Sequence, residues 1–357
     1  MNKQKILNFS SSLLAVVFGL IFGLIILLFT SPAEAVKGIG IILLGGFADG
    51  LTGIGSVIYI ATPIIMTGLS VGFAFKTGLF NIGAPGQFTM GAFIAVYIGI
   101  KWTFLPASIH WIVALLGAVI GGALWGMIPG ILKAYRNVNE VIASIMMNYI
   151  GMYLVNFLIR TNIYDKLRNQ TQTVEASANI PKAGLDKLFD SPNLNIGFLI
   201  AIFFVIVVYI LIEKTAFGFE LKACGMNQDA SRYAGINAKK NIVLSMMIAG
   251  ALSGIGGALL YLAGTGRYLQ VLDILATEGF NGIPVALLGL SNPIGILCAA
   301  LFIAHITVGG INLQLLDFVP EIIDIIIAAI IYCGAFSLIF KQIIEYVMKK
   351  VRKEESV

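Results

Sequence analysis

Long apolar runs recur along the chain and restrict its fold more than any other feature of the sequence. The first run, residues 13–29, holds 17 residues without a charge. Hydrophobic residues make up 58% of the chain and charged residues 11%, whereas soluble globular proteins contain about 25% charged residues. A membrane-spanning helix needs about 20 mostly apolar residues, and a helix satisfies its own backbone polar groups. The sequence therefore predicts an all-α polytopic membrane protein, with a single transmembrane domain over residues 1–357.

The apolar runs predict about ten spans, of which the third and the eighth are broken. The first run is longer than the roughly 7–15 apolar residues of a signal peptide, so we expect an uncleaved first span. The segment 30–54 is interrupted by glycines and by Asp49, and we expect a partial or interfacial helix there. The predicted spans are 13–29, 55–75, 81–100, 109–130, 138–159, 196–212, 242–263, 280–290, 293–309 and 318–340.

The predicted chain has two halves, with both termini in the cytoplasm. A first half, 1–160, is followed by an extracellular loop, 161–195, a second half, 196–340, and a basic tail, 341–357. This orientation places 15 of the 23 Lys and Arg residues on inner segments and eight on outer segments, as the positive-inside rule requires. An even number of spans follows. The basic residues lie at span ends and not on one face, which disfavours nucleic-acid binding.

A glycine-rich segment, 78–91, interrupts the third predicted span. It contains Asn81, Pro85 and Gln87 together with four glycines. Proline removes a backbone donor and glycine loosens the backbone, so a regular helix is not expected to run through this segment. In a bilayer, a broken backbone is tolerated only where protein or a water-filled cavity satisfies its polar groups. We therefore expect the segment to line a pathway.

The eighth predicted span echoes the third. The order Phe-Asn, then Gly, then Pro in residues 80–85 recurs in residues 280–284, although a glycine-rich membrane protein can produce two short matches by chance. In a division into five plus five spans, these are the third spans of the two halves, and they cross in opposite directions. Interrupted spans at corresponding positions of inverted repeats point to a substrate site. We therefore predict a five-plus-five inverted repeat with the substrate route at its two breaks.

Neutral amide side chains lie at both breaks. Asn81 and Gln87 belong to the first break and Asn281 to the second. They either line the substrate route or bridge neighbouring helices, as polar side chains in spans do at about 0.6 kcal/mol each. Their neutrality suits an uncharged cargo such as a sugar or a nucleoside, because a charged cargo requires an opposite charge within the spans.

The fifth predicted span has a polar stripe. Glu140, Ser144 and Asn148 follow one another at intervals of four residues, which drifts only about 80° around an α-helix. Asn148 is a candidate for the pathway. Glu140 either extends the stripe or lies at the inner interface near Lys133 and Arg136.

Charged groups that could catalyse or drive a reaction are few. Asp273 and Glu278, before the eighth span, are either an outer vestibule, with Glu278 as a pathway candidate, or solvated loop carboxylates. His305 is expected to bridge helices. The spans contain no series of Asp, Glu and His residues of the kind that relays protons, so proton-driven transport is not indicated. Lys76-Thr77 lacks the preceding glycine of a phosphate-binding loop, and no metal cluster or nucleophile–base pair is found. The chain is predicted not to be an enzyme and to hold no cofactor of its own.

The inner loop 214–238 is polar but contains several apolar residues. We expect two short helices, separated by Gly225 and ended by Gly235, with Lys222 and Arg232 exposed. The loop is either a solvated connector or a docking surface for a soluble partner. Docking is favoured by its apolar members, Leu221, Met226, Tyr233 and Ile236.

Four motifs now point to a family. They are Phe-Asn-Ile-Gly-Ala-Pro-Gly-Gln (80–87), Asn-Glu-Val-Ile-Ala-Ser-Ile-Met-Met-Asn-Tyr (139–149), the inner loop, and Gly-Phe-Asn-Gly-Ile-Pro-Val-Ala-Leu-Leu-Gly (279–289). In this order they resemble permeases of ABC importers, within the nucleoside and simple-sugar group related to the ribose and branched-chain amino-acid permeases. The family usually has an acidic residue where this chain has Pro85, which weakens the transfer of an acidic contact to that position.

The resemblance implies a coupling function for the inner loop and a set of partners. The loop would dock on a cytoplasmic ATPase subunit, which would bind ATP and Mg²⁺. A second permease subunit in a heterodimer and an extracellular substrate-binding lipoprotein are also implied, with nucleosides as the cargo and the cytoplasmic membrane as the location. The alternatives are a simple-sugar permease, a secondary transporter and a purely structural membrane subunit. By motif match, the coupling residues are Gly218, Lys222, Gly225, Asn227, Arg232 and Gly235.

Overall fold

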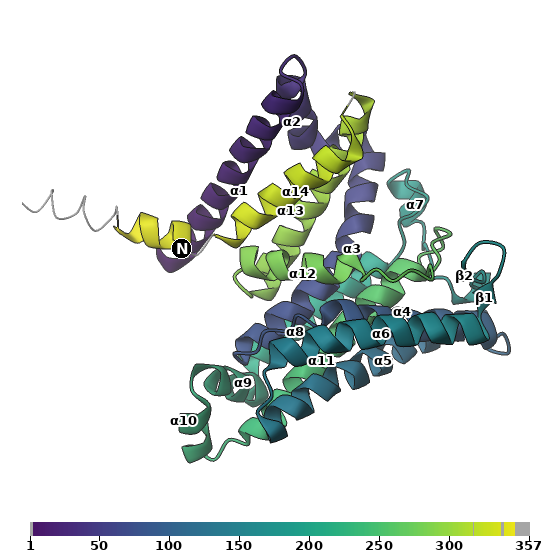
Figure 1. Ribbon diagram of the computed structural model, residues 1–357, viewed down its shortest axis with the longest axis vertical. Coiled ribbons are helices and arrows are strands. Elements are labelled where there is room, and N and C mark those ends of the chain that lie inside the picture. Colours follow the sequence, from purple (N-terminus) through teal and green to yellow (C-terminus); the bar gives the residue numbers. More distant parts are fainter. Residues whose placement is uncertain (1–2, 317, 337–338, 347–357) are drawn as a thin grey trace, which may run out of the picture.

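The chain forms a bundle of helices in the computed structural model (Figure 1), which describes residues 3–316, 318–336 and 339–346. Strands β1 (Tyr164–Asp165) and β2 (Gln170–Thr171) form one antiparallel hairpin. Short 3₁₀ helices cover Gly45–Phe47, Ala176–Ala178 and Leu313–Leu315. The α-helices are α1 (Lys3–Thr30), α2 (Ala35–Leu44), α3 (Gly50–Lys76), α4 (Ala84–Lys101), α5 (Ala107–Arg136), α6 (Glu140–Asn162), α7 (Leu185–Leu188), α8 (Gly197–Lys214), α9 (Ala216–Met226), α10 (Gln228–Tyr233), α11 (Ala238–Tyr261), α12 (Thr277–Leu288), α13 (Pro293–Asn312) and α14 (Pro320–Ala335).

Seven helices in the described part of the chain are long and apolar enough to cross a membrane: α1, α3, α5, α6, α8, α11 and α13. This confirms the predicted all-α, multi-pass class. The predicted third and eighth spans correspond to α4 and α12, and the tenth corresponds to α14. These three helices lie outside the set of seven, so the count of ten spans stays a prediction.

The expected interruption within the third and eighth spans is wrong, because α4 runs as one helix through Gly86 and Gly91, and α12 runs through Pro284. Pro85 is tolerated because it lies in the first turn of α4. The irregular chain lies before each helix instead, at 77–83 and 262–276, and these two segments are the breaks.

Small residues bring the central helices close together. On α5, Gly122 and Gly126 face Gly250 and Gly254 on α11, and a Cβ added at Gly250 would overlap the Gly122 carbonyl oxygen. Glycines four residues apart allow helix backbones to approach closely in membranes, where van der Waals packing drives association. The α3 and α11 helices are the most deeply buried of the seven. Helix α4 packs on α11 and α5, and α12 packs on α3.

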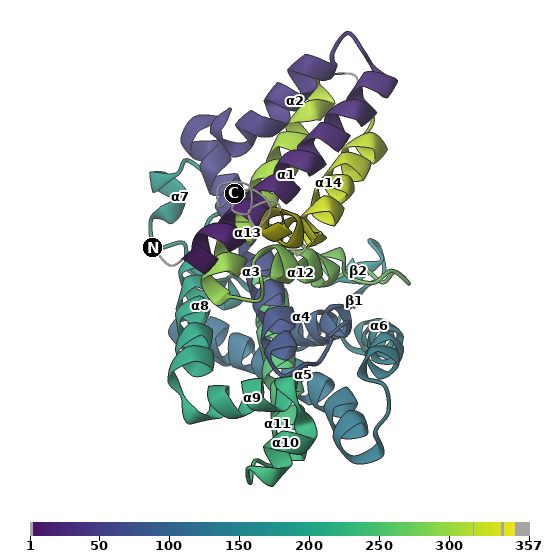
Figure 2. The ribbon, with the colours of Figure 1, turned by 90° about the vertical axis from the view of Figure 1, so that its left-hand side faces the viewer.

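A second group of helices, formed by α1, α2, α13 and α14, lies to one side of this centre (Figure 2). It has its own apolar cluster, which includes Leu27, Ile42 and Phe318. His305 on α13 joins the group to the segment before α3, because its ring nitrogens bond to the Gly46 N–H at 3.3 Å and to a second backbone group at 3.0 Å. The prediction that His305 bridges helices is confirmed.

Several element boundaries differ from those expected. Within 30–54, the partial helix is α2, but α3 already begins at Gly50, five residues before the predicted start. In the inner loop, the expected break at Gly225 is wrong. Helix α9 continues through Gly225, and the break falls at Asn227, whose side chain accepts the N–H groups of Asp229 and Ala230 and so caps α10. Asparagine is a strong helix N-cap, and this capping fixes the break.

Candidate functional site

The two broken segments meet in the middle of the molecule. Helix α4 begins at Ala84 and α12 at Thr277, and their first turns are in contact. A Cβ added at Gly279 would overlap the Pro85 backbone. Glycine at 279 therefore permits a close approach that a larger residue would prevent. Segments far apart in the sequence are thus brought to a single junction.

Hydroxyl groups tie α4 and α12 each to a neighbouring span. Thr67 on α3 donates to the Glu278 carbonyl oxygen of α12 at 3.0 Å. Ser253 on α11 donates to the Ala84 carbonyl oxygen of α4 at 2.8 Å. In the predicted five-plus-five division, α3 and α11 occupy corresponding positions, and so do α4 and α12. Each hydroxyl therefore bonds to the first turn of the helix that follows the break in the other half.

An amide network closes the first break. Asn81 and Gln87 are 0% and 1% exposed. Their side chains form a reciprocal pair, in which Asn81 Nδ2 donates to Gln87 Oε1 at 2.9 Å and Gln87 Nε2 donates to Asn81 Oδ1 at 3.1 Å. Asn81 also accepts the Gly83 N–H at 3.1 Å and donates to Ser70 on α3 at 3.2 Å. In this conformation, the two amides hold the break together, and their polar atoms bond within the protein.

Asn148, on α6, forms hydrogen bonds with the backbone on both sides of Gly83 in the same break. Its Oδ1 accepts the Gly86 N–H at 2.9 Å, and its Nδ2 donates to the Ile82 carbonyl at 2.9 Å. The Gly86 N–H belongs to the first turn of α4, which has no acceptor within the helix. Asn281 lies half-buried in α12 and takes no part in this network. Of the predicted amide residues of the pathway, Asn81, Gln87 and Asn148 therefore meet at the first break, whereas Asn281 lies apart from them.

The other two residues of the α6 stripe, Glu140 and Ser144, differ in their surroundings: one is ion-paired and the other is buried beside the break. Glu140 pairs with Lys133 at 2.9 Å, so its carboxylate lies at the inner end of the helix. Ser144 Oγ is buried without a hydrogen-bond partner among the described residues, and it lies against Gly83 of the break. A buried, unpaired hydroxyl is uncommon, and this one is positioned to bond if the broken segment moves.

A cavity of about 280 Å³ lies beside the junction, between α4, α6, α11 and the segment 268–278. Its apolar lining comes mainly from α6 and from leucine and isoleucine side chains of that segment. The residues that line it with polar or aromatic groups are Thr89, Asn156, Tyr261, Tyr268, Gln270, Thr277 and Glu278. Two tyrosine rings together with neutral amides are groups that suit an uncharged, hydrogen-bonding ligand with a flat face.

The carboxylate of Glu278 is neutralised at the edge of the cavity. Arg267 Nη1 lies 3.6 Å from Glu278 Oε1, and the same guanidinium lies 5.9 Å from the centre of the Tyr59 ring. The Tyr59 hydroxyl bonds to Thr265 at 3.2 Å. Arg267 therefore offsets the charge of Glu278 at this edge, and the expected vestibule carboxylate is an ion-paired one.

Backbone pairing forms the outer wall of the cavity. Thr171 N–H donates to the Leu269 carbonyl at 3.0 Å, and Val271 N–H donates to the Asn169 carbonyl at 3.2 Å. From α6, Asn156 Nδ2 donates to Asp273 Oδ1 at 3.0 Å. Sequence reasoning missed Asn156, although it lies eight residues after Asn148 on the same helix and only about 80° around the axis from it. Tyr261 and Tyr268 were also missed, because no regular spacing in the sequence marks them.

The inner loop folds as α9 and α10 at the far end from the hairpin (Figure 1). Lys222 is half-buried and pairs with Glu213 at 3.1 Å, whereas the exposed Arg232 lies 3.6 Å from Asp229. Gly218 packs against backbone carbonyls of α8, and Gly235 follows α10 with a φ of +80°. Met226 and Tyr233 are 87% and 95% exposed, while Leu221 is buried. Two of the four apolar residues are thus available for docking as expected, and Leu221 belongs to the core.

The inner loop also contacts the chain leading to the first break. A Cβ at Gly225 would lie 2.6 Å from the Lys76 carbonyl oxygen and 2.9 Å from the Gly78 nitrogen. Gly78 has a φ of +71° and ends α3, three residues before Asn81. Helix α9 therefore rests directly on the turn that connects α3 to the break.

Comparisons with known proteins agree with this architecture. Residues 53–335 match the family described as the branched-chain amino acid transport system permease component. The guanosine ABC transporter permease NupP of Bacillus subtilis (strain 168) is 39% identical over 96% of both chains. The nucleoside ABC transporter permease NupB of Lactococcus lactis subsp. cremoris is 37% identical over 95% of this chain and 93% of its own. The glucose ABC transporter permease TsgB13 of Haloferax volcanii is 32% identical over 83% and 80%.

Both the Bacillus and the Lactococcus species also have a second, more distant relative of this chain that is named as a permease. No solved structure matches the chain. The matched region contains both broken segments, the cavity and the inner loop, which are the features that the geometry singles out. The chain therefore belongs to the branched-chain amino acid transport system permease family, and it is a multi-pass, non-catalytic permease subunit of an ABC transporter.

Proposed function

We propose that this permease subunit imports nucleosides across the cytoplasmic membrane in an ATP-driven ABC transporter. The cavity beside the junction supports this proposal most directly. The rings of Tyr261 and Tyr268 suit stacking on a flat base. The Gln270 amide supplies a neutral donor and acceptor, and Asn156, whose Nδ2 already donates within the protein, supplies its Oδ1 as an acceptor. The relatives named for guanosine and for nucleosides, at 39% and 37% identity, support the same cargo.

The route inward passes from this cavity to the junction. Glu278 lies at its outer part, and the substrate then meets the first break, where Asn81 and Gln87 bond to each other and Asn148 holds the backbone. These bonds must open for a solute to pass, and each freed amide then offers its donor and acceptor to the cargo. Alternating access requires such a barrier on one side in each state. Asn281, on α12 after the second break, completes the proposed set.

Both termini lie in the cytoplasm in this proposal, with ten spans in a five-plus-five inverted repeat. The start of α1, residues 339–346 and helices α9 and α10 lie toward one side of the molecule in Figure 1, and the β hairpin lies toward the opposite side. The crossed pair of hydroxyl bonds, from Thr67 to α12 and from Ser253 to α4, supports the repeat. The excess of Lys and Arg on inner segments supports the orientation.

A second permease subunit is proposed to cover the exposed face of α6, which points away from the other helices of this chain. That face presents large side chains at helical spacing, including Met146, Tyr149, Tyr153 and Phe157, which are all exposed. The two tyrosine hydroxyls lie within the span, and lipid tails offer them no hydrogen bond, whereas a partner protein or a wet pathway does. The presence of a second related permease in the organisms of the two nucleoside relatives supports a heterodimer.

Cytoplasmic and extracellular partners complete the proposed importer. A separate ATPase subunit would bind ATP and Mg²⁺ and dock on α9 and α10, where Met226, Tyr233 and Arg232 are exposed. Movement of α9 would reach the break through the contact of Gly225 with the turn at Gly78. A substrate-binding lipoprotein would deliver the cargo on the outer side, near the cavity wall.

Uptake of labelled guanosine and uridine, with and without the gene for this chain, tests the proposal. We expect nucleoside uptake to be lost with the gene and ribose uptake to be retained. Unchanged nucleoside uptake together with lost ribose or glucose uptake would favour a simple-sugar permease, the alternative supported by the glucose permease relative. Uptake that persists without any ATP-binding partner would instead favour a secondary transporter.

A further inference from the structure

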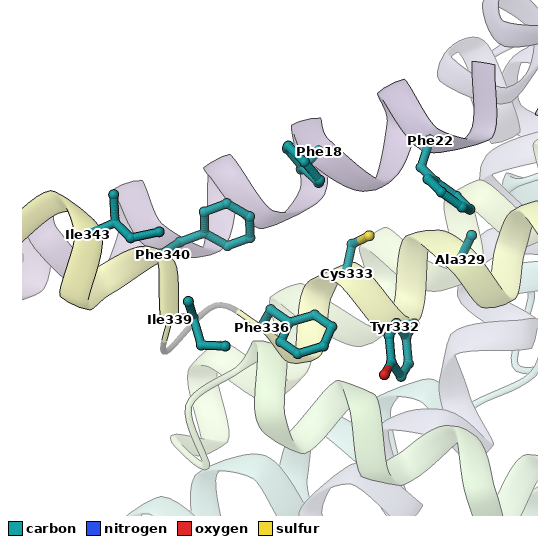
Figure 3. Close-up of a pocket in the computed structure, with 9 residues that line it drawn as sticks. All are labelled: Phe18, Phe22, Ala329, Tyr332, Cys333, Phe336, Ile339, Phe340 and Ile343. Atoms are coloured by element: carbon teal, nitrogen blue, oxygen red, sulfur yellow. The ribbon is translucent and has the colours of Figure 1, made fainter. Parts of the chain in front are cut away.

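The polar cavity beside the junction contains one charged side chain in its wall. Glu278 is the only Asp, Glu, Lys or Arg among the residues that line it. By contrast, the groove that α1 forms with α14 and residues 339–343 (Figure 3) has the Tyr332 hydroxyl and the Cys333 thiol as the only polar side-chain atoms in its lining. A nucleobase in that groove would lose its hydration without regaining its hydrogen bonds. A carboxylate in the polar cavity, however, can accept hydrogen bonds from a base.

The backbone of Glu278 is held in a defined position. Its carbonyl oxygen accepts the Thr67 hydroxyl of α3 at 3.0 Å. The next residue, Gly279, packs so closely on the Pro85 backbone that a Cβ there would overlap it. The Glu278 side chain, which is 27% exposed, therefore starts from a fixed point in the first turn of α12. A group that is positioned before the ligand arrives loses little conformational freedom on binding.

The carboxylate of Glu278 keeps acceptor capacity for a ligand. Arg267 Nη1 lies 3.6 Å from Glu278 Oε1, which is longer than the usual N–H···O distance of about 2.7–3.2 Å. Thr277 Oγ1 donates to Glu278 Oε2 at 3.3 Å, which is also long for an O–H···O bond of about 2.5–3.0 Å. A carboxylate accepts at about four positions on its two oxygens. Arg267 thus offsets the charge of Glu278 without using up its acceptors.

Two neighbouring acceptor oxygens match one pattern among the common nucleobases. Guanine presents its N1–H and its N2 amino group side by side, and a carboxylate can accept two such parallel N–H bonds. Adenine, cytosine and uracil place a ring or carbonyl acceptor next to the donor on the same edge, and an acceptor that faces a carboxylate oxygen is repelled. Hypoxanthine has the N1–H but lacks the amino group. The carboxylate therefore distinguishes guanine from each of the others.

We infer that Glu278 selects guanosine among nucleosides, by accepting the N1–H and one N2–H of the base on its two oxygens. This inference rests on the proposed function, because it requires a nucleoside in this cavity. The rings of Tyr261 and Tyr268 supply stacking surfaces for the face of the base, while the carboxylate reads its edge. A site that bonds to an N–H of its ligand rejects the analogue that lacks this group, because the partner in the site is left unpaired.

Guanosine and inosine test the inference, since inosine lacks only the N2 amino group. The complete transporter is placed in nanodiscs without the binding lipoprotein, so that the lipoprotein contributes nothing to the selectivity. The Kd values of guanosine, inosine and adenosine are measured by isothermal titration. We expect the wild type to bind guanosine about 10–100-fold more tightly than inosine, which is the ratio that one hydrogen bond to a charged group supplies.

Glu278→Gln and one matched control assign the selectivity to this side chain. The amide has almost the same shape, but it presents one acceptor beside one donor, which opposes one guanine donor and matches N1 and N6 of adenine. We expect the ratio of guanosine to inosine affinity to fall to about threefold or less, and adenosine to bind more tightly than to the wild type. Glu175→Gln, at an exposed position of the loop 161–195 outside the cavity lining, is expected to keep the wild-type ratio.

A gain in adenosine affinity cannot result from misfolding, and the wild-type ratio tests the inference even if Glu278→Gln fails to fold. Equal affinities of the wild type for guanosine and inosine would overturn the inference. So would a guanosine preference that Glu278→Gln retains. Both results would leave the proposed cargo intact, whereas binding of none of the three nucleosides would refute the cargo and with it the role of Glu278.

Discussion

Replacing Asn148 by alanine tests whether one side chain holds the first break in place. The substitution removes the acceptor of the Gly86 N–H and the donor to the Ile82 carbonyl, both at 2.9 Å. A buried polar group left unpaired costs about 1–3 kcal/mol, which sets an upper estimate of about 2–6 kcal/mol for two groups. Side-chain bonds between membrane helices average only about 0.6 kcal/mol. We expect a loss of about 2 kcal/mol, because the Gly86 N–H has no acceptor within α4.

Thermal unfolding of the purified chain in nanodiscs measures this loss. About 2 kcal/mol corresponds to a Tm decrease of about 4–8 °C on the scale of domains with 150–250 residues. Asn162→Ala is the matched control, since Asn162 lies on the same helix, is exposed, and bonds with its Nδ2 to Leu158 of its own helix. If Asn148→Ala unfolds at the same temperature as Asn162→Ala, then Asn148 does not hold the break and the reasoning is refuted.

Three further substitutions test the packing and the coupling surface. Gly225→Val places side-chain atoms against the Lys76 carbonyl oxygen, and we expect ATP hydrolysis to continue while its stimulation by substrate is lost. Gly250→Leu separates α11 from Gly122 of α5, and we expect a loss of about 2–3 kcal/mol in the free energy of unfolding, as for overpacked cores. Arg232→Glu reverses an exposed charge, and we expect normal unfolding but weaker binding of the ATPase subunit.

One control, at a glycine with free space around it, serves the two glycine variants. A Cβ at Gly40, on α2, meets no atom within 4 Å, so Gly40→Val serves as the control for the two glycine variants. Substrate-stimulated ATP hydrolysis by Gly225→Val at the wild-type rate would remove the α9 contact from the mechanism. A Gly250→Leu protein as stable as Gly40→Val would contradict the close packing of α5 on α11. Unchanged ATPase binding by Arg232→Glu would exclude its role in docking.

The sequence predicted the helical class, the irregular start of the segment 78–91 and the bridging function of His305. Each of these follows from local chemistry: apolar runs of span length, proline and glycine within an apolar run, and one imidazole without a charged partner. The location of Glu140 at the inner interface near Lys133 was also among the alternatives, because both lie near the ends of adjacent spans. These features depend on few long-range contacts, so composition and spacing are sufficient to find them.

Tertiary structure decided the remaining features. The amide pair of Asn81 and Gln87 depends on the path of the chain before α4, which the sequence does not specify. Tyr268 reaches the cavity, next to Tyr261 at the end of α11, only because the segment after α11 folds back against the β hairpin. Gly225 was expected to break a helix, but its contact with the turn after α3 is what requires a glycine there. Such close approaches between distant segments have no periodic pattern in the sequence.

The central claim is that the cavity beside the junction takes a nucleoside. Labelled guanosine uptake by cells that express the complete transporter, with either the wild-type chain or Tyr268→Ala, tests it most directly. Base–aromatic stacking contributes about 1–3 kcal/mol per base, so loss of the ring weakens capture of the cargo. We expect the uptake rate at subsaturating guanosine to fall about tenfold, with ATPase binding unchanged. An uptake rate for Tyr268→Ala equal to that of the wild type would contradict the account.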